Sequence, residues 1–341
     1  MFTSKIRASE TYSPRRIVVT GALGHVGSRL IHELPIEFPN ADIVMLDNLS
    51  TQRYVSLFNL PSQGRYRFVE GDILTADLAE IFCESDAVIH LAAITDAAGS
   101  NDIPERLQEI NVRGTERVAY ACIRTGSALL FPSSTSVYGV SASIVDENCQ
   151  SQDLLPQSLY AHSKLKCEQM LAALGKSHNL DFIIFRLGTV FGVSAGMRFH
   201  TAINKFIWQA SQDTPLTVWR TALQQRRPYL DLSDAAAAVS FILRQRIFDR
   251  QIYNVLTTNA TVSEIVEYIR VHVPDLQVNY VDSPIMNQLS YTVSNRKFRA
   301  LGFEFKGNLR AGIEETVQLL QSISNCKSHS HALVESDAGT A

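Results

Sequence analysis

The segment Gly21-Ala22-Leu23-Gly24-His25-Val26-Gly27 constrains the fold of this 341-residue chain more than any other feature. It directly follows the apolar run of residues 17–20 and leads into a helical pattern over residues 28–34. Glycine permits a tight turn there and a close approach between strand and helix. The amino end of the helix offers unpaired N–H groups and a favourable dipole to a phosphate. The segment therefore predicts a strand, a phosphate-binding turn and a helix.

A carboxylate follows the second apolar run, residues 43–47, which ends in Asp47 about 20 residues after the last glycine. At that position it can accept hydrogen bonds from the adenosine ribose of a dinucleotide. Because it would repel the 2'-phosphate of NADP, the predicted cofactor is NAD. We expect His25 to face solvent or the pyrophosphate and not to act as a base. The predicted cofactor site comprises Gly21, Leu23, Gly24, His25, Val26, Gly27, Asp47 and Asn48.

Asp72, in Gly71-Asp72-Ile73 after the third apolar run, has two open interpretations: it caps a loop, or it binds the adenine.

The third and later apolar runs cover residues 67–70, 87–91, 128–133 and 181–186, separated by amphipathic stretches. Most are rich in Val, Ile, Leu or Phe without strict alternation, as expected for strands covered on both faces. This β-α-β order predicts an α/β protein with a Rossmann-type, doubly wound parallel sheet.

The rhythm of the chain changes at about residue 191. Helical patterns follow at residues 202–210, 262–272 and 309–323, with strand-like segments at 216–219 and 251–255. We expect an NAD-binding Rossmann domain over residues 15–190. Residues 228–256 are expected to be interleaved with it, because this later segment would return to the same sheet. A smaller C-terminal α/β substrate domain would then occupy 191–323, with residues 1–14 and 324–341 as flexible termini.

Composition excludes several classes of partner. The net charge of -3 offers no excess of positive charge for nucleic acid or an anionic membrane. The five cysteines are widely spaced and form no C-x-x-C pair, which argues against a disulfide framework and a zinc site. No apolar run reaches the roughly 18 residues of a membrane span, and residues 1–14 lack the apolar core of a signal peptide. The sequence predicts a cytoplasmic protein without metal.

A hydroxyl-rich strand end and a tyrosine-lysine pair suggest the chemistry. Ser133, Ser134, Thr135 and Ser136 follow a buried strand, and Tyr160 and Lys164 lie one turn apart in a helical pattern. A free phenol has a pKa of about 10, and a lysine cation on the same face favours the phenolate. A Ser or Thr hydroxyl would orient the substrate oxygen. The set fits removal of a proton from an alcohol while hydride leaves to a nicotinamide.

Together these segments resemble the extended short-chain dehydrogenase/reductase family, the nucleotide-sugar epimerases and dehydratases. The resemblance covers residues 16–320. It rests on residues 20–27, 47–48, 71–73, 90–93 (His-Leu-Ala-Ala), 111–115 (Asn-Val-Arg-Gly-Thr), 133–139, 160–164, 186–192 and 227–234.

The resemblance implies a role for each matching position. Tyr160 would be the acid/base, Lys164 would hold the nicotinamide ribose and lower the pKa of Tyr160, and Ser134 would bind the reacting hydroxyl. Arg227 would clamp the substrate diphosphate, a task suited to a guanidinium. Further implied cofactor contacts are Asp72, Ile73, Leu91, Ala92, Ala93 and Asn111, and further substrate contacts are Thr135, Thr189 and Asn204.

Three departures from the family pattern bear on the reaction. Thr135 and Ser136 stand where family dehydratases place acidic residues, Thr189 replaces a common asparagine, and residues 282–287 lack a second arginine. The first departure favours NAD-dependent epimerisation, at C4 through a 4-keto sugar. Alternatives are a nucleotide-sugar dehydratase, a 4-keto reductase, or a non-enzymatic NAD sensor. The sugar and the nucleotide stay open.

The resemblance also implies a homodimer. Its expected interface pairs residues 104–124 and 160–177 of two subunits in a four-helix bundle. Apolar positions at helical spacing in these stretches are Val118, Ala121, Cys122, Leu165, Met170 and Leu174.

Overall fold

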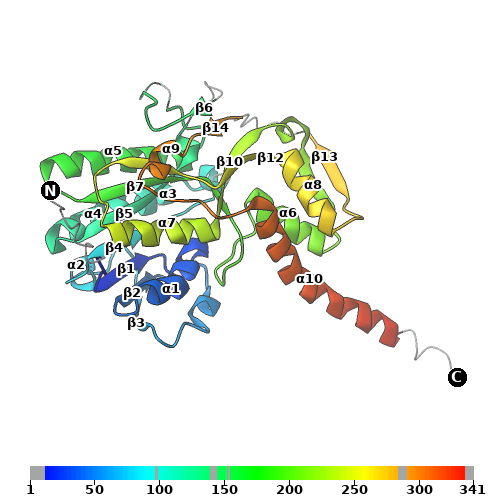
Figure 1. Ribbon diagram of the computed structural model, residues 1–341, viewed down its shortest axis with the longest axis horizontal. Coiled ribbons are helices and arrows are strands. Elements are labelled where there is room, and N and C mark those ends of the chain that lie inside the picture. The colour runs from blue at the N-terminus through cyan, green and yellow to red at the C-terminus, as the bar shows by residue number, and fades with distance from the viewer. Residues whose placement is uncertain are drawn as a thin grey trace, which may run out of the picture.

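A seven-stranded sheet, parallel throughout, forms the centre of the computed structural model, in the order β11-β7-β5-β4-β1-β2-β3 (Figure 1). The structure describes residues 12–96, 99–138, 144–150, 152, 154–282 and 290–334. The α/β fold and the predicted strand positions are confirmed. The strands are β1 (Arg16–Thr20), β2 (Asp42–Asp47), β3 (Arg65–Glu70), β4 (Ala87–His90), β5 (Ala128–Ser134), β7 (Phe182–Leu187) and β11 (Ile252–Val255).

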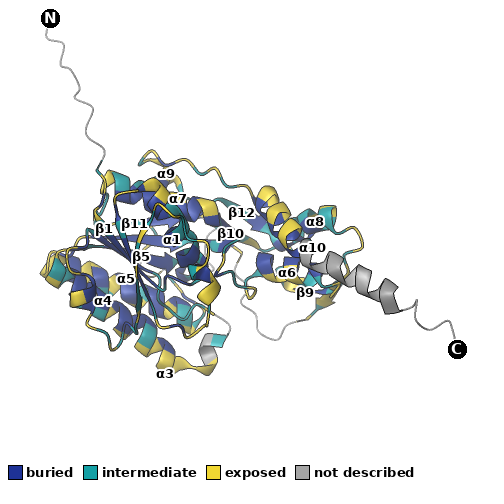
Figure 2. Ribbon diagram, turned by 90° about the horizontal axis from the view of Figure 1, so that it is seen from below, coloured by how far each residue is buried: buried dark blue, intermediate teal, exposed yellow. Residues whose placement is uncertain are grey.

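Helices cover both faces of this sheet, which explains why most of its strands are apolar without alternation; the edge strand β3 is only partly buried. Val18 and Val19, adjacent in β1, are both fully buried in opposite core clusters. One cluster contains α1 (His25–Glu37) and α7 (Leu232–Gln245). The other contains α2 (Leu78–Ile81), α4 (Gly114–Thr125) and α5 (Leu159–Ser177). Figure 2 shows the central strands in dark blue between helices whose outer sides are exposed.

A smaller lobe lies beside the central sheet, on the right of Figure 1. Its core gathers residues of α6 (Ala202–Ser211), α8 (Val262–His272) and α10 (Leu309–Val334), three predicted helices. Residues 324–334 continue α10, whereas the sequence predicted an irregular terminus there; residues 1–11 and 335–341 lie outside the described residues. The lobe's small sheets have the orders β12-β10-β8 and β13-β9: β8 (Thr189–Phe191), β9 (Leu216–Trp219), β10 (Arg226–Asp231), β12 (Thr258–Thr261) and β13 (Val278–Val281).

The chain passes between the two parts more than once. After β10 it returns to the central sheet as α7 and β11, and β11 pairs with β7 at the sheet edge. Several further short elements complete the two parts. They are α3 (Pro104–Leu107), a π-helical turn (Gln108–Arg113), α9 (Arg296–Arg299) and the parallel pair β6 (Ile144–Val145) and β14 (Thr292–Val293). The domain boundaries stay a prediction.

Among the described helices, none combines the length and the apolar composition that crossing a membrane requires.

The apolar positions expected at a dimer interface are largely used inside the subunit. Val118, Ala121, Cys122 and Leu174 are buried in the core beneath α4 and α5. The outer sides of these helices instead expose residues such as Tyr120, Lys166 and Ala173.

Candidate active site

The glycine-rich turn brings the ends of β1, β4 and α1 into contact. Gly21 adopts φ +65°, and a Cβ there would lie 2.6 Å from the backbone nitrogen of Ala92. A Cβ on Gly27 would lie 2.4 Å from the carbonyl oxygen of Gly21. Both glycines are therefore required by the close approach of backbone, an arrangement that suits a turn between a strand and a phosphate-binding helix.

The Asp47 carboxylate is fixed beside this turn. Its Oδ2 accepts a hydrogen bond from the backbone N–H of Leu23 at 3.0 Å, and its Oδ1 accepts from that of Leu49 at 2.9 Å. Asp72 accepts from Asn48 Nδ2 at 2.9 Å and from the backbone N–H of Leu74 at 2.8 Å. Asp72 thus caps its loop, one of the two predicted interpretations, and fixes the side chain that follows Asp47.

His25 is buried, which excludes solvent, one of the two expected surroundings; a contact with the pyrophosphate stays a prediction. Its Nδ1 lies 2.9 Å from Ser194 Oγ, and the backbone N–H of Gly196 donates to Ser28 Oγ at 2.9 Å. These contacts hold the loop after β8 against the first turn of α1. Burial, assisted by the charge of Arg198, lowers the pKa of His25 to about 3. The imidazole is neutral at ordinary pH and anchors the loop.

Ser134 and Tyr160 meet where β5 ends and α5 begins. Ser158 caps α5, because its Oγ accepts from the backbone N–H of Ala161 at 3.2 Å. Ser134 Oγ accepts from the backbone N–H of Ser136 at 3.1 Å and from its hydroxyl at 2.8 Å. A side-chain hydrogen bond also joins Ser134 to Tyr160 and favours the phenolate. The two predicted hydroxyl groups are therefore in contact.

Lys164 lies on the same face of α5, one turn further along. Its Nζ donates to the carbonyl oxygen of Pro132 at 2.8 Å and lies 5.9 Å from the ring centre of Tyr160. Burial lowers the pKa of Lys164 to about 8, and the neighbouring Cys167 and Glu168 oppose this shift. At this pKa the side chain is mostly an ammonium at neutral pH.

The acidity of Tyr160 differs from the expectation. Burial raises the pKa of this phenol, and the groups that lower it are Arg198 and then Ser134. The Lys164 ammonium, which donates to the Pro132 carbonyl, is not among the groups that lower the pKa of Tyr160 in this structure. The cation that favours the Tyr160 phenolate is Arg198.

Arg198 was missed by the sequence analysis. It comes from the loop between β8 and α6, and its guanidinium donates to the hydroxyl of Thr95. Its Nε is buried and has no hydrogen-bond partner in the part of the chain that the structure describes. Thr95 and Arg198 are far apart in sequence, so no local pattern places this cation near Tyr160.

Asn111 orders the loop that follows β4. It lies in the π-helical turn, an irregularity often found at functional sites. Its Oδ1 accepts from the backbone N–H of Ile94 at 2.8 Å, and its Nδ2 donates to the Ile94 carbonyl at 2.9 Å and to Ser163 Oγ at 3.2 Å. The predicted cofactor contacts Leu91, Ala92 and Ala93 precede this anchor and are partly exposed.

The predicted substrate contacts divide into two groups. Thr135 and Asn204 are buried, and their side chains bond to other parts of the chain. Thr135 Oγ1 donates to Leu187 O at 3.1 Å, and Asn204 Nδ2 donates to Arg198 O at 3.0 Å. Thr189 and Arg227 are partly exposed on the neighbouring strands β8 and β10. Residues 283–287, where a second arginine was lacking, lie outside the described residues.

Comparisons with known proteins agree on one family. Its model, the NAD dependent epimerase/dehydratase family, matches residues 17–255. The trifunctional UDP-glucose 4,6-dehydratase/UDP-4-keto-6-deoxy-D-glucose 3,5-epimerase/UDP-4-keto-L-rhamnose-reductase of Arabidopsis thaliana is 29% identical over 323 residues. That alignment covers 90% of this chain and 47% of the relative, so the chain spans about half the length of that protein.

Two solved structures resemble the whole fold. The UDP-N-acetylglucosamine 4-epimerase of Methanobrevibacter ruminantium, in complex with UDP-N-acetylmuramic acid, has a TM-score of 0.79 and 25% identity, covering 92% of this chain and 100% of the other. The UDP-glucose 4-epimerase of Thermus thermophilus, in complex with NAD, has a TM-score of 0.74 and 25% identity, covering 90% and 99%.

Proposed function

The chain belongs to the NAD dependent epimerase/dehydratase family, and we propose that it inverts C4 of a nucleotide-activated sugar through a transient 4-keto intermediate. The observation that carries this proposal is the contact between the Ser134 and Tyr160 hydroxyls, with Lys164 on the next turn of α5. The cofactor is NAD, which when bound accepts hydride from the sugar carbon and later returns it.

The cofactor residues fit this assignment. Gly21 and Gly27 leave no room for side chains at the turn, so backbone can approach the pyrophosphate. Asp47 is held by two backbone N–H groups with its charge available to the ribose hydroxyls. We assign the remaining cofactor contacts to the turn residues, Asn48, Asp72 and the segment 91–93 that Asn111 anchors.

The chain's own groups would then move one proton. Tyr160 as phenolate removes the proton of the sugar 4-hydroxyl, and Ser134 orients that oxygen. The 4-keto sugar turns in the site and presents its other face. Tyr160 returns the proton to the oxygen when hydride comes back to C4, so the reaction has no net redox change. Arg198 stabilises the phenolate, and Arg227 holds the diphosphate.

A nucleotide-sugar 4,6-dehydratase is the second candidate, because that activity appears in the name of the Arabidopsis relative. Such an enzyme needs a further acid, and the positions beside Ser134 supply none. The Thr135 hydroxyl donates to a carbonyl and the Ser136 hydroxyl donates to Ser134. Epimerisation needs only the groups present, so it is the preferred function.

The homodimer is proposed as part of the same function. With the apolar inner faces of α4 and α5 used in the core, the contact would form through their outer sides, which expose Tyr120, Lys166, Ala172 and Ala173. Replacing Ala173 with Arg should weaken this contact. Light scattering at micromolar concentration measures it, and a monomeric wild-type mass refutes the dimer.

The deciding experiment incubates the purified protein with UDP-, GDP-, CDP- and dTDP-sugars and identifies the products. An epimerase converts one sugar into its C4 epimer without added cofactor, and NAD should remain bound through purification. Loss of water from the sugar would favour the dehydratase, and stoichiometric consumption of NADH would favour a 4-keto reductase. Binding of NAD with no change in any sugar would point to a sensor.

A further inference from the structure

We propose that Glu168 is a positioning residue, which fixes the turn of α5 carrying Tyr160 and Lys164 and supplies the negative charge beside the Lys164 ammonium. The inference rests on the proposed function, because it concerns the groups that prepare Tyr160 for proton transfer. Tyr160, Lys164 and Glu168 recur every four residues in α5 and therefore share one face of the helix. Glu168 is 3% exposed, which is unusual for a carboxylate.

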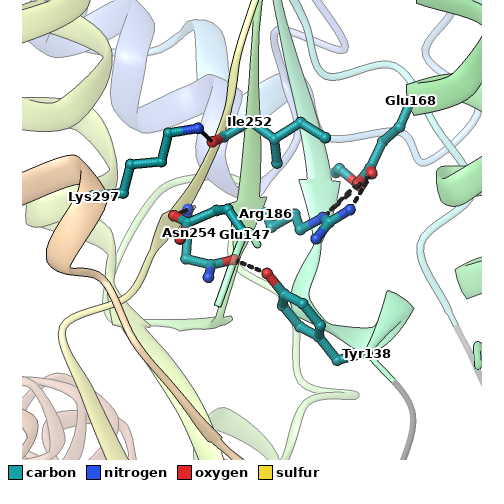
Figure 3. A network of polar contacts seen from close by, with 8 residues as sticks. Tyr138, Glu147, Glu168, Arg186, Ile252, Asn254 and Lys297 are labelled. Atoms are coloured by element: carbon teal, nitrogen blue, oxygen red, sulfur yellow. Dashed lines mark hydrogen bonds and ion pairs between the residues drawn. The ribbon is translucent and has the colours of Figure 1, made fainter. Parts of the chain in front are cut away.

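Glu168 fastens α5 to two strands of the central sheet (Figure 3). Its Oε2 accepts from Arg186 Nη2 at 2.6 Å and its Oε1 from Arg186 Nε at 3.0 Å, a two-point contact. Ser133 Oγ donates to the same Oε1. Ser133 and Arg186 are register partners on β5 and β7, and Ser133 precedes Ser134. The carboxylate therefore fixes the helix with Tyr160 relative to the strand with Ser134.

The partner of Glu168 is itself held in place. The Arg186 guanidinium lies 4.8 Å over the ring centre of Tyr138, whose hydroxyl donates to Asn254 Oδ1 at 2.8 Å. The backbone N–H of Asn254 donates to Glu147 at 2.6 Å. Figure 3 shows this succession of contacts from α5 across β7 to β11. A buried ion pair cannot separate without leaving two unpaired charges, so its geometry is fixed.

The charge of Glu168 acts on Lys164. The titratable groups that face Lys164 are Tyr160, Cys167 and Glu168 on α5 and His90 on β4. Burial lowers the pKa of His90 to about 3 and raises that of the Cys167 thiol, so both are neutral at ordinary pH. Glu168 therefore holds the negative charge that opposes the burial of the ammonium.

The test uses a double variant, Glu168→Gln with Arg186→Met. Glu168→Gln alone would leave the Arg186 cation buried and unpaired, which is strongly destabilising, whereas replacing both partners removes that penalty. The glutamine oxygen still accepts from Ser133. We expect the pKa of Lys164, measured by NMR with lysine labelled at Cε and assigned with Lys164→Met, to fall, because Glu168 is among the groups that raise it and Arg186 is not. The alkaline limb of the activity profile should move by the same amount, because the ammonium expected to hold the nicotinamide ribose is lost at lower pH.

Glu147→Gln is the matched control, since it removes a carboxylate at the far end of the same network. Its Lys164 pKa and alkaline limb should equal those of the wild type. A folded double variant with an unchanged Lys164 pKa and profile would overturn the inference. If the double variant unfolds, Glu168→Asp is tested instead, because it keeps the charge and shortens the side chain. A wild-type Lys164 pKa with a reduced kcat would support the positioning role, and an unchanged kcat would refute that role. These outcomes are separate from the proposed function, which fails if the wild type does not epimerise any sugar.

Discussion

Tyr160→Phe should abolish turnover while leaving the fold and NAD binding intact. The substitution removes one hydroxyl, keeps the ring, and leaves Ser134 Oγ with its contacts to Ser136. Loss of a positioned general base costs about 100- to 10,000-fold in rate, or roughly 2.7 to 5.5 kcal/mol in the activation barrier. One partly exposed hydrogen bond contributes only about 0.5–1.5 kcal/mol to stability.

Tyr138→Phe is the control, because it makes the same chemical change in a residue outside the reaction. The Tyr138 hydroxyl is buried and donates to Asn254 Oδ1, which would lose its partner at a cost of about 1–3 kcal/mol. We therefore expect the melting temperature to fall for Tyr138→Phe and the kcat to fall for Tyr160→Phe. Thermal unfolding, NAD titration and product formation measure these effects. Near-normal turnover by Tyr160→Phe on the true substrate would refute the active-site assignment.

Three further predictions follow from the site. Gly21→Ala should destabilise the fold by more than the roughly 1–2 kcal/mol of an alanine in the left-handed conformation, because its Cβ would meet the backbone of Ala92. Gly126→Ala is the control and should cost only that amount, since Gly126 has φ +72° and open space around it. Equal melting temperatures for the two variants would contradict this prediction. Asp47→Asn should narrow the preference for NAD over NADP, measured as the ratio of the two dissociation constants. An unchanged ratio would show that the carboxylate does not select the cofactor. Arg198→Ala should move the rising limb of the pH–activity profile to higher pH, since a cation that lowers the pKa of Tyr160 is removed; a fixed limb would show that Arg198 does not act on the base.

Local features of the sequence were enough to predict the framework of this protein. The central strands and the longer helices stand at the predicted positions, because apolar periodicity depends on neighbours along the chain. The turn after β1 and the spacing of Tyr160 and Lys164 are local too, since a few adjacent residues decide backbone conformation and helix face.

The sequence could not predict which distant segments come into contact, or which side chains these contacts bury. His25 is anchored by Ser194, Arg198 reaches the Tyr160 region from the other lobe, and Asn204 is turned inward to its own loop. Burial also reversed the expected direction of the Tyr160 pKa shift and used the apolar sides of α4 and α5 within the subunit. Periodicity identifies which face of a helix is apolar, but only tertiary packing determines what covers that face and which charges become neighbours.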